Sequence, residues 1–150
     1  MNLFKGSKIY MNPFPPQPVH PDDFHKFPEP IPSSVIFASE SEIKAKIFAT
    51  FSGIISFGTS STSQKPGITI HLSDSIEPEV LKEKVYIYRF DSETEGWKFI
   101  EKSGEWYNIT EQAPLEVREY TREELYKELK ENPEITFEEE LKEKENTAIS

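Results

Sequence analysis

The sequence predicts an α+β domain in which a split, mostly antiparallel sheet packs against one helix after Ser39 and a second helix near the C-terminal end. Short runs rich in β-branched and aromatic residues recur along the chain, which is typical of strands. Two Ser/Thr-x-x-Glu sequences precede apolar residues at helical spacing, which is the pattern of a capped helix. Glycines and prolines between these segments supply the turns.

The first elements are a short strand and a proline-rich segment. A strand is expected within residues 3–10. Residues 12–32 contain eight prolines, and since proline fixes φ and has no N–H, this segment is neither a helix nor a central strand. Interleaved Phe14, Phe24 and Phe27 indicate that the segment packs on the domain instead of forming a free linker.

The central element is a buried strand at residues 35–38 that turns into a helix. Ser39 is expected to cap this helix, with Glu42 completing the capping box, and the helix should reach about Thr50. The face expected to be buried contains Ile43, Ile47 and Phe48. Because such a strand and helix form the core of many domains, the pattern alone does not distinguish a structural from a ligand-binding role.

The remaining strands follow from alternating or continuous apolar runs. They are expected at residues 53–58, 68–72, 85–90, 97–100, 105–109 and 115–120. A short helix is expected from Ser75 to Leu81. Thr121 and Glu124 form the second capping box, and the stripe of Leu125 and Leu129 predicts a helix that ends at residues 132–133.

Length and composition indicate one domain over residues 1–133, followed by an acidic tail over residues 134–150 that is partly helical or disordered. The 150 residues are 35% hydrophobic and 13% aromatic, which is enough to form a core. The chain has no cysteine, which removes disulfides and cysteine nucleophiles. It also shows no signal-peptide pattern and no apolar run near the roughly 20 residues of a membrane helix, so we expect a cytoplasmic, non-membrane protein.

The net charge of −10 is unevenly distributed. Residues 1–73 carry 6 Lys and Arg against 5 Asp and Glu, whereas residues 74–150 carry 11 against 22. An acidic half argues against binding to a nucleic-acid backbone, which requires a basic face. It suits a basic protein partner, so a non-catalytic interaction protein is one functional alternative. A DNA mimic is disfavoured because the acidic residues are concentrated in one segment.

Side chains with an obvious catalytic or metal-binding pattern are scarce. The only histidines are His20, His25 and His71, and no His-x-x-x-His pair accompanies them, so we expect no metal site. The chain has neither a Gly-x-Ser-x-Gly sequence nor a phosphate-binding glycine-rich motif. Carboxylates are abundant in the acidic half, where most belong to the surface.

The order of four segments resembles small ADP-ribosyltransferase-like domains, particularly the rifampin ADP-ribosyltransferase type. These are Phe-Lys-Gly-Ser at residues 4–7, Val-Ile-Phe-Ala-Ser at 35–39, the strand at 84–91, and the stretch from Glu-Trp-Tyr-Asn to Ala-Pro-Leu-Glu-Val at 105–117. That family carries His-Gly-Thr/Ser in its first strand, an aromatic element before a helix, and an acidic residue shortly before a Glu-Pro-Leu-x-Val strand. The resemblance implies the fold of that family.

The resemblance also implies a site for NAD or a related nucleotide. Lys5, Gly6 and Ser7 would hold the nicotinamide carboxamide through backbone bonds, and Phe37 would stack on the ring. The family's histidine is Lys5 here and its tyrosine is Phe37, so a hydroxyl that orients the ligand is missing.

The late acid of the family corresponds to Glu101 or Glu105. In this family the carboxylate stabilises the positive charge that develops as nicotinamide leaves. Because of the departures at the first two motifs, the resemblance implies a protein that binds NAD or a related nucleotide with its transfer activity lost or altered, or one that keeps only the fold.

Overall fold

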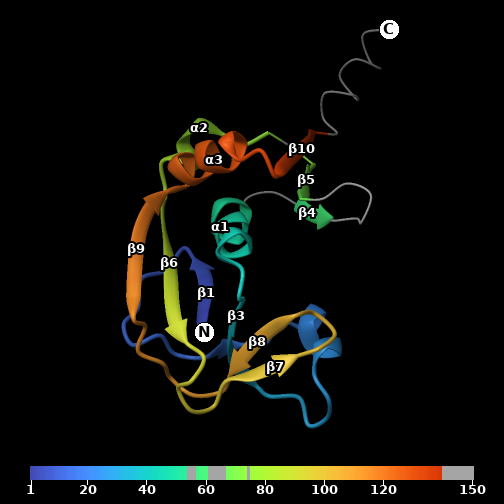
Figure 1. The fold of residues 1–150 in the computed structure, drawn as a ribbon, viewed down its shortest axis with the longest axis vertical. Helices are drawn as coiled ribbons and strands as arrows, with labels where there is room; N and C mark the ends of the chain where they lie inside the picture. The colour runs from blue at the N-terminus through green and yellow to red at the C-terminus, as the bar shows by residue number, and fades with distance from the viewer. Residues whose placement is uncertain (54–56, 61–66, 74, 140–150) are drawn as a thin grey trace, which may run out of the picture.

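The computed structural model of the protein describes residues 1–53, 57–60, 67–73 and 75–139. Figure 1 shows the arrangement of its elements. The strands are β1 (Asn2–Ser7), β2 (Gln17–Pro18), β3 (Ser34–Ala38), β4 (Phe57–Ser60), β5 (Ile68–Leu72), β6 (Lys84–Asp91), β7 (Lys98–Ile100), β8 (Glu105–Asn108), β9 (Glu116–Thr121) and β10 (Ile135–Glu139). The helices are η1 (Pro21–Lys26, a 3₁₀ helix), α1 (Glu42–Phe51), α2 (Pro78–Leu81) and α3 (Arg122–Glu131).

The described strands form three sheets, with orders β1-β6-β9, β2-β3-β8-β7 and β10-β5-β4. All pairs are antiparallel except β10 with β5. The expected α+β class and mostly antiparallel pairing are therefore confirmed, although three sheets replace the single split sheet. A two-bond bridge between Phe4 and Ser39, at 2.7 and 2.8 Å, connects β1 to the end of β3.

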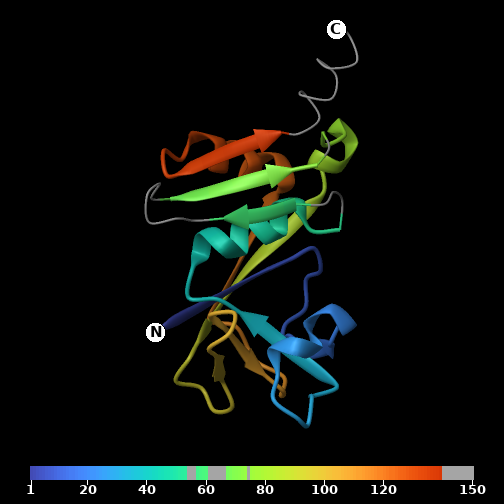
Figure 2. The same cartoon turned by 90° about the vertical axis from the view of Figure 1, so that its right-hand side faces the viewer.

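Helix α1 lies between the first and third of these sheets (Figure 2). Its Ile47 and Phe51 pack with apolar side chains of β5, α3 and β10. Its Ala45 and Ala49 face β1 and β6, in a cluster with Val85 of β6. Both faces of the helix are therefore covered, which makes α1 the centre of the core.

The beginning of α1 differs from the expectation. Ser41, not Ser39, is the N-cap, and its hydroxyl accepts a hydrogen bond from the N–H of Lys44 at 3.2 Å. Ser39 instead exchanges backbone bonds with Phe4 and therefore still belongs to the strand pairing, so the helix begins only after it. The Ser39 hydroxyl accepts a bond from the N–H of Ser41 at 3.1 Å.

One face of α1 also differs from the expectation. Ile47 is buried and Ile43 is partly buried, but Phe48 is 50% exposed. Adjacent residues in a helix lie about 100° apart, so Ile47 and Phe48 do not both point to the centre of one face. The core side is taken by Ile47, and Phe48 is left at the surface.

The second capping box is confirmed. Thr121 is the N-cap of α3, its hydroxyl accepts from the N–H of Glu124 at 3.1 Å, and the Glu124 carboxylate accepts from the N–H of Thr121 at 2.9 Å. Leu125 and Leu129 are buried, as their spacing predicts.

The expected tail is wrong for its first residues. Residues 135–139 form β10, which pairs in parallel with β5, and Ile135 is buried. This pairing joins segments far apart in the sequence, so the local charge pattern did not reveal it. Residues 140–150 lie outside the described part of the chain.

The proline-rich segment packs on the domain through Phe14, Val19 and Phe27, all of which are buried. Phe24, which was expected to pack as well, is 43% exposed.

Three other differences concern short elements. The proline-rich segment was expected to contain no helix, but residues 21–26 form the 3₁₀ helix η1, with Pro21 as its first residue, a position that proline tolerates. Helix α2 begins at Pro78, and Glu77 is its N-cap in place of Ser75. Strand β4 begins at Phe57, and residues 54–56 of the expected strand lie outside the described residues. Across the described ranges, no helix is long and apolar enough to cross a membrane.

Arg122, the first residue of α3, holds the C-terminal end of α1. Its guanidinium Nη1 donates to the backbone carbonyls of Ala49, Thr50 and Ser52, each at 3.1 Å. Its Nε lies 3.2 Å from a carboxylate oxygen of Glu83, and its side chain is 2% exposed. Because the last carbonyls of a helix lack intrahelical partners, this one side chain satisfies a need of α1 and fixes it against α3.

We expect Arg122→Met to destabilise the protein by about 2–4 kcal/mol, because it leaves carbonyls of α1 buried without a donor. Arg118→Met on β9 is the matched control. Arg118 is an exposed arginine paired with Glu116, and its loss should cost less than about 1 kcal/mol. Urea unfolding of the three proteins measures the difference. Equal stability of both variants would show that Arg122 does not hold α1.

Candidate functional site

A cleft of about 390 Å³ opens between β1, the β3–α1 junction, η1 and the turn before β8. This volume lies within the range of small-molecule pockets. Four of the residues singled out by the sequence line it: Lys5, Gly6, Phe37 and Glu105. They come from three strands, β1, β3 and β8, that are separated in the sequence.

Two other candidate residues do not reach this cleft. Glu101 is exposed in the turn after β7, so Glu105 is the carboxylate that the fold brings to the cleft. Ser7 lines a separate, smaller pocket of about 190 Å³, and its hydroxyl accepts a bond from the N–H of Ile9 at 3.1 Å.

Strand pairing explains why these residues meet. Phe37 pairs with Tyr107 of β8, which places the start of β8, and with it Glu105, near the end of β3. The bridge between Phe4 and Ser39 brings β1 to the same end of β3. The cleft is therefore built where the first and second sheets meet beside α1.

Gly6 is required at its position by close packing. A Cβ atom there would lie 2.1 Å from the carbonyl oxygen of Ala45 and 2.9 Å from the Cβ of Ala49, so only glycine lets α1 approach β1 this closely. Hydrogen bonding alternates along an antiparallel pair, and Phe4 directs its N–H and C=O away from β6 to Ser39. Two residues along, Gly6 directs its own N–H and C=O to the same edge.

Lys5 is a partly buried cation in this cleft. Its ammonium donates to the carbonyl oxygen of Phe37 at 3.3 Å and lies 5.4 Å from the ring centroid of Phe14. Burial lowers the pKa of Lys5 from 10.5 to about 8, and the charge of Glu105 only partly opposes this shift. Within the described ranges, no carboxylate forms an ion pair with it.

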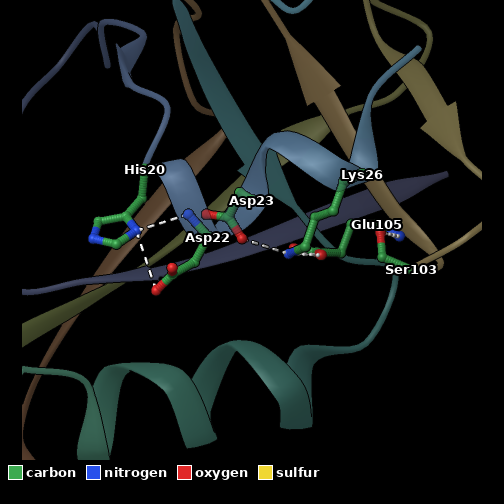
Figure 3. Close-up of polar contacts among 6 residues, drawn as sticks. All are labelled: His20, Asp22, Asp23, Lys26, Ser103 and Glu105. Carbon is green, nitrogen blue, oxygen red and sulfur yellow. Dashed lines mark hydrogen bonds and ion pairs between the residues drawn. The ribbon is translucent and has the colours of Figure 1, made fainter.

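Glu105 is held by Lys26 of η1, as Figure 3 shows. The Lys26 ammonium lies 2.7 Å from the Glu105 carboxylate and 3.0 Å from that of Asp23. Burial would lower the pKa of Lys26, but hydrogen bonds to Glu105 and Asp23 outweigh it and raise that pKa. The cleft therefore contains a cluster in which one ammonium forms ion pairs with two carboxylates.

Phe37 and Phe48 are two of the three phenylalanines that line the same cleft, and the third is Phe4. The ring of Phe37 is partly buried, lies 5.7 Å from that of Phe27 and has the Lys26 ammonium 5.2 Å from its centroid. Phe48, half exposed on α1, is the second.

Sequence reasoning missed four lining residues: Asp23, Lys26, Lys44 and Phe48. Asp23 and Lys26 lie in the proline-rich segment, whose pattern indicates packing on the domain and does not indicate a charged site. Lys44 and Phe48 lie one turn apart on α1, and that i, i+4 spacing was the available signal for a shared face. The described residues contain no group of three or more His, Cys, Asp or Glu that could hold a metal ion.

The chain matches no protein-family model, no curated protein and no solved structure in comparisons with known proteins. The function of the protein is therefore inferred from the geometry of the cleft.

We expect Lys5→Met to stabilise the protein at pH 7 by roughly 1–3 kcal/mol, because it removes a buried charge without an ion-pair partner. The folded pKa near 8 lies below the ordinary value of 10.5, so the cost of burying the charge is complete below pH 8. As the pH rises from 8 toward 10.5, the unfolded chain binds more protons than the folded protein, and the cost disappears. The stabilisation should therefore shrink between pH 7 and pH 9.5 in urea titrations. Lys8→Met, at an exposed lysine nearby, is the control and should show no such pH dependence; a wild-type protein as stable as the Lys5 variant at pH 7 would contradict the expectation.

Proposed function

We propose that this protein is an ADP-ribosyltransferase-like protein that binds NAD or a related nucleotide in the cleft, with its transfer activity lost or altered. The observation that carries the proposal is that Gly6, Phe37 and Glu105, chosen by resemblance to that family, line one cleft. They belong to three different strands, and strand pairing brings them together beside α1.

The backbone of Gly6 suits the carboxamide of nicotinamide. A carboxamide offers one acceptor and one donor type, and Gly6 directs one N–H and one C=O to the strand edge beside Ser39. Ser39 and Gly6 both line the cleft. The face of Phe37 supplies an aromatic surface for a ring, although the Lys26 ammonium already lies near it.

The charges of the cleft support binding better than transfer. A carboxylate that promotes transfer must face the positive charge developing as nicotinamide leaves. Here Glu105 is 2.7 Å from the Lys26 ammonium, so most of its charge is already compensated. The lysines would still attract the phosphates of a nucleotide.

The rival proposal is a non-catalytic protein that binds a basic partner with its acidic half. The exposed surface of α3 carries Lys127 and Lys130 among its glutamates, and Glu128 pairs with Lys46 at 2.9 Å. Because this surface is mixed in charge, it favours the rival less than the cleft favours a nucleotide. A measurement of NAD binding distinguishes the nucleotide-binding proposal from the interaction-protein proposal.

We expect calorimetry to detect NAD binding, and Phe37→Ala to weaken it by roughly 1–3 kcal/mol, the scale of a lost aromatic stack on a base. Phe99→Ala is the matched control. Phe99 is a half-exposed aromatic residue on β7 that does not line the cleft, so its loss should leave the affinity unchanged. Undetectable binding of NAD, ADP-ribose and ADP at millimolar concentration would leave the interaction protein as the better proposal.

A further inference from the structure

The cleft is locally positive in a protein whose net charge is −10. Three lysines line it, Lys5, Lys26 and Lys44, against two carboxylates, Asp23 and Glu105. Lys26 forms ion pairs with both of these carboxylates. Among the described residues, neither of the two remaining lysines forms an ion pair, so the cleft offers positive charge that the chain itself does not balance.

Lys5 is the more demanding of the two. An ammonium has three N–H donors, and among the described residues Lys5 donates to one acceptor, the carbonyl oxygen of Phe37. A partly buried cation that lacks a counter-ion is costly, and the cost is recovered when an anion enters beside it. The geometry therefore favours an anionic group of the ligand at Lys5.

The rest of the cleft fits a ligand that carries an apolar ring as well. Phe48 lies one turn of α1 beyond Lys44, and its ring is half exposed. Gly6 adds a backbone N–H to the positive end. Lysines and an aromatic surface that line the same cleft correspond to the phosphate and the base of a nucleotide.

We infer that the cleft prefers nucleotides with a free terminal phosphate over NAD, whose nicotinamide ring is cationic. Lys5 and Lys44 bind that phosphate, and the base lies against Phe48. The inference rests on the proposed function, because it names the ligand class of the same cleft.

The preference for a phosphate over a nicotinamide ring follows from the sign of the electrostatic interaction with the lysine ammonium. At short range in a partly buried site, the charge of one ammonium attracts a phosphate and repels a nicotinamide ring by several times the thermal energy. Lys5 and Lys26 both lie on the side of the cleft where Gly6 and Phe37 would receive the nicotinamide. A terminal phosphate removes this repulsion and gives Lys5 a counter-ion.

Proton binding should accompany ligand binding. The charged groups that line the cleft with Lys5 are Glu105 on β8, Asp23 and Lys26 on η1, and Lys44 on α1, and of these the charge of Glu105 acts on Lys5. Since the pKa of Lys5 is about 8, part of the free protein lacks this proton at pH 8.5, and a bound phosphate restores it. Affinity for the phosphate should then fall as the pH rises from 7.5 to 9.5, a range in which the terminal phosphate of ADP stays fully ionised.

The test uses the full chain and calorimetry with two matched ligand pairs at pH 7.5. ADP against adenosine measures the phosphate, and ADP-ribose against NAD measures the cationic ring. We expect ADP to bind at least roughly tenfold more tightly than adenosine, and ADP-ribose more tightly than NAD, on the scale of a charge-assisted hydrogen bond. At pH 8.5, titrations in two buffers of different ionisation enthalpy should show proton uptake with ADP.

Two variants connect these effects to the lysines. Lys5→Met should weaken ADP roughly tenfold or more and abolish both the proton uptake and the pH dependence. Lys44→Gln, an exposed helix position that does not endanger folding, should weaken ADP while keeping the proton uptake. Lys8→Gln removes one nearby charge outside the cleft and should change neither.

The outcomes separate the inference from the function on which it rests. If NAD binds as tightly as ADP-ribose, and ADP binding is independent of Lys5, the inference is wrong and the proposed function stands. If NAD, ADP-ribose and ADP all fail to bind at millimolar concentration, both are wrong.

Discussion

The contact between α1 and β1 at Gly6 determines where the other parts of the structure lie. Without a side chain at this position, the carbonyl oxygen of Ala45 can approach the strand. The helix then covers β1 and β6 with its alanines, and its opposite face remains for the sheet of β4, β5 and β10. Since Gly6 also lines the cleft, the same close approach that builds the core determines the shape of the candidate site.

A second constraint acts at the other end of the helix. The Arg122 side chain donates to the backbone carbonyls of Ala49, Thr50 and Ser52 at the end of α1, and Arg122 is itself the first residue of α3. Helix α1 is thus fixed to β1 near its beginning, through Ala45, and to α3 at its end. A cleft bordered by a helix held at both ends keeps its dimensions, which is what a binding site requires.

The sequence was sufficient where structure is local. The capping box of Thr121 and Glu124 was predicted because both partners lie within one turn. Ser39 was assigned as a cap because the pattern does not reveal that Phe4 already holds its backbone. Strand β10 was missed for the same reason, since β5 supplies its partner from far along the chain.

The candidate site likewise contains residues that the local sequence indicates and residues that only the fold brings together. Gly6, Phe37 and Glu105 were predicted from short segments that resemble a known family, and they line one cleft, whereas Ser7 and Glu101, predicted in the same way, do not. Lys26 belongs to no such motif, and only folding of the proline-rich segment brings it against Glu105. Sequence reasoning therefore found the strand residues of the cleft and missed the group that controls their charge.

The position of Lys26 has a consequence for how the wall of the cleft is held. In the described residues between Val19 and Ser33, the backbone hydrogen bonds of the segment are internal turns. Its attachment to β8 therefore depends on the packing of Phe27 against Tyr107 and on the ion pair of Lys26 with Glu105. Dissolved ions weaken the second attachment more than the first, because they screen charge and leave apolar contacts in place. High ionic strength should therefore weaken the attachment of η1 to β8 through the ion pair alone, and only in part, because both side chains of the pair are partly buried.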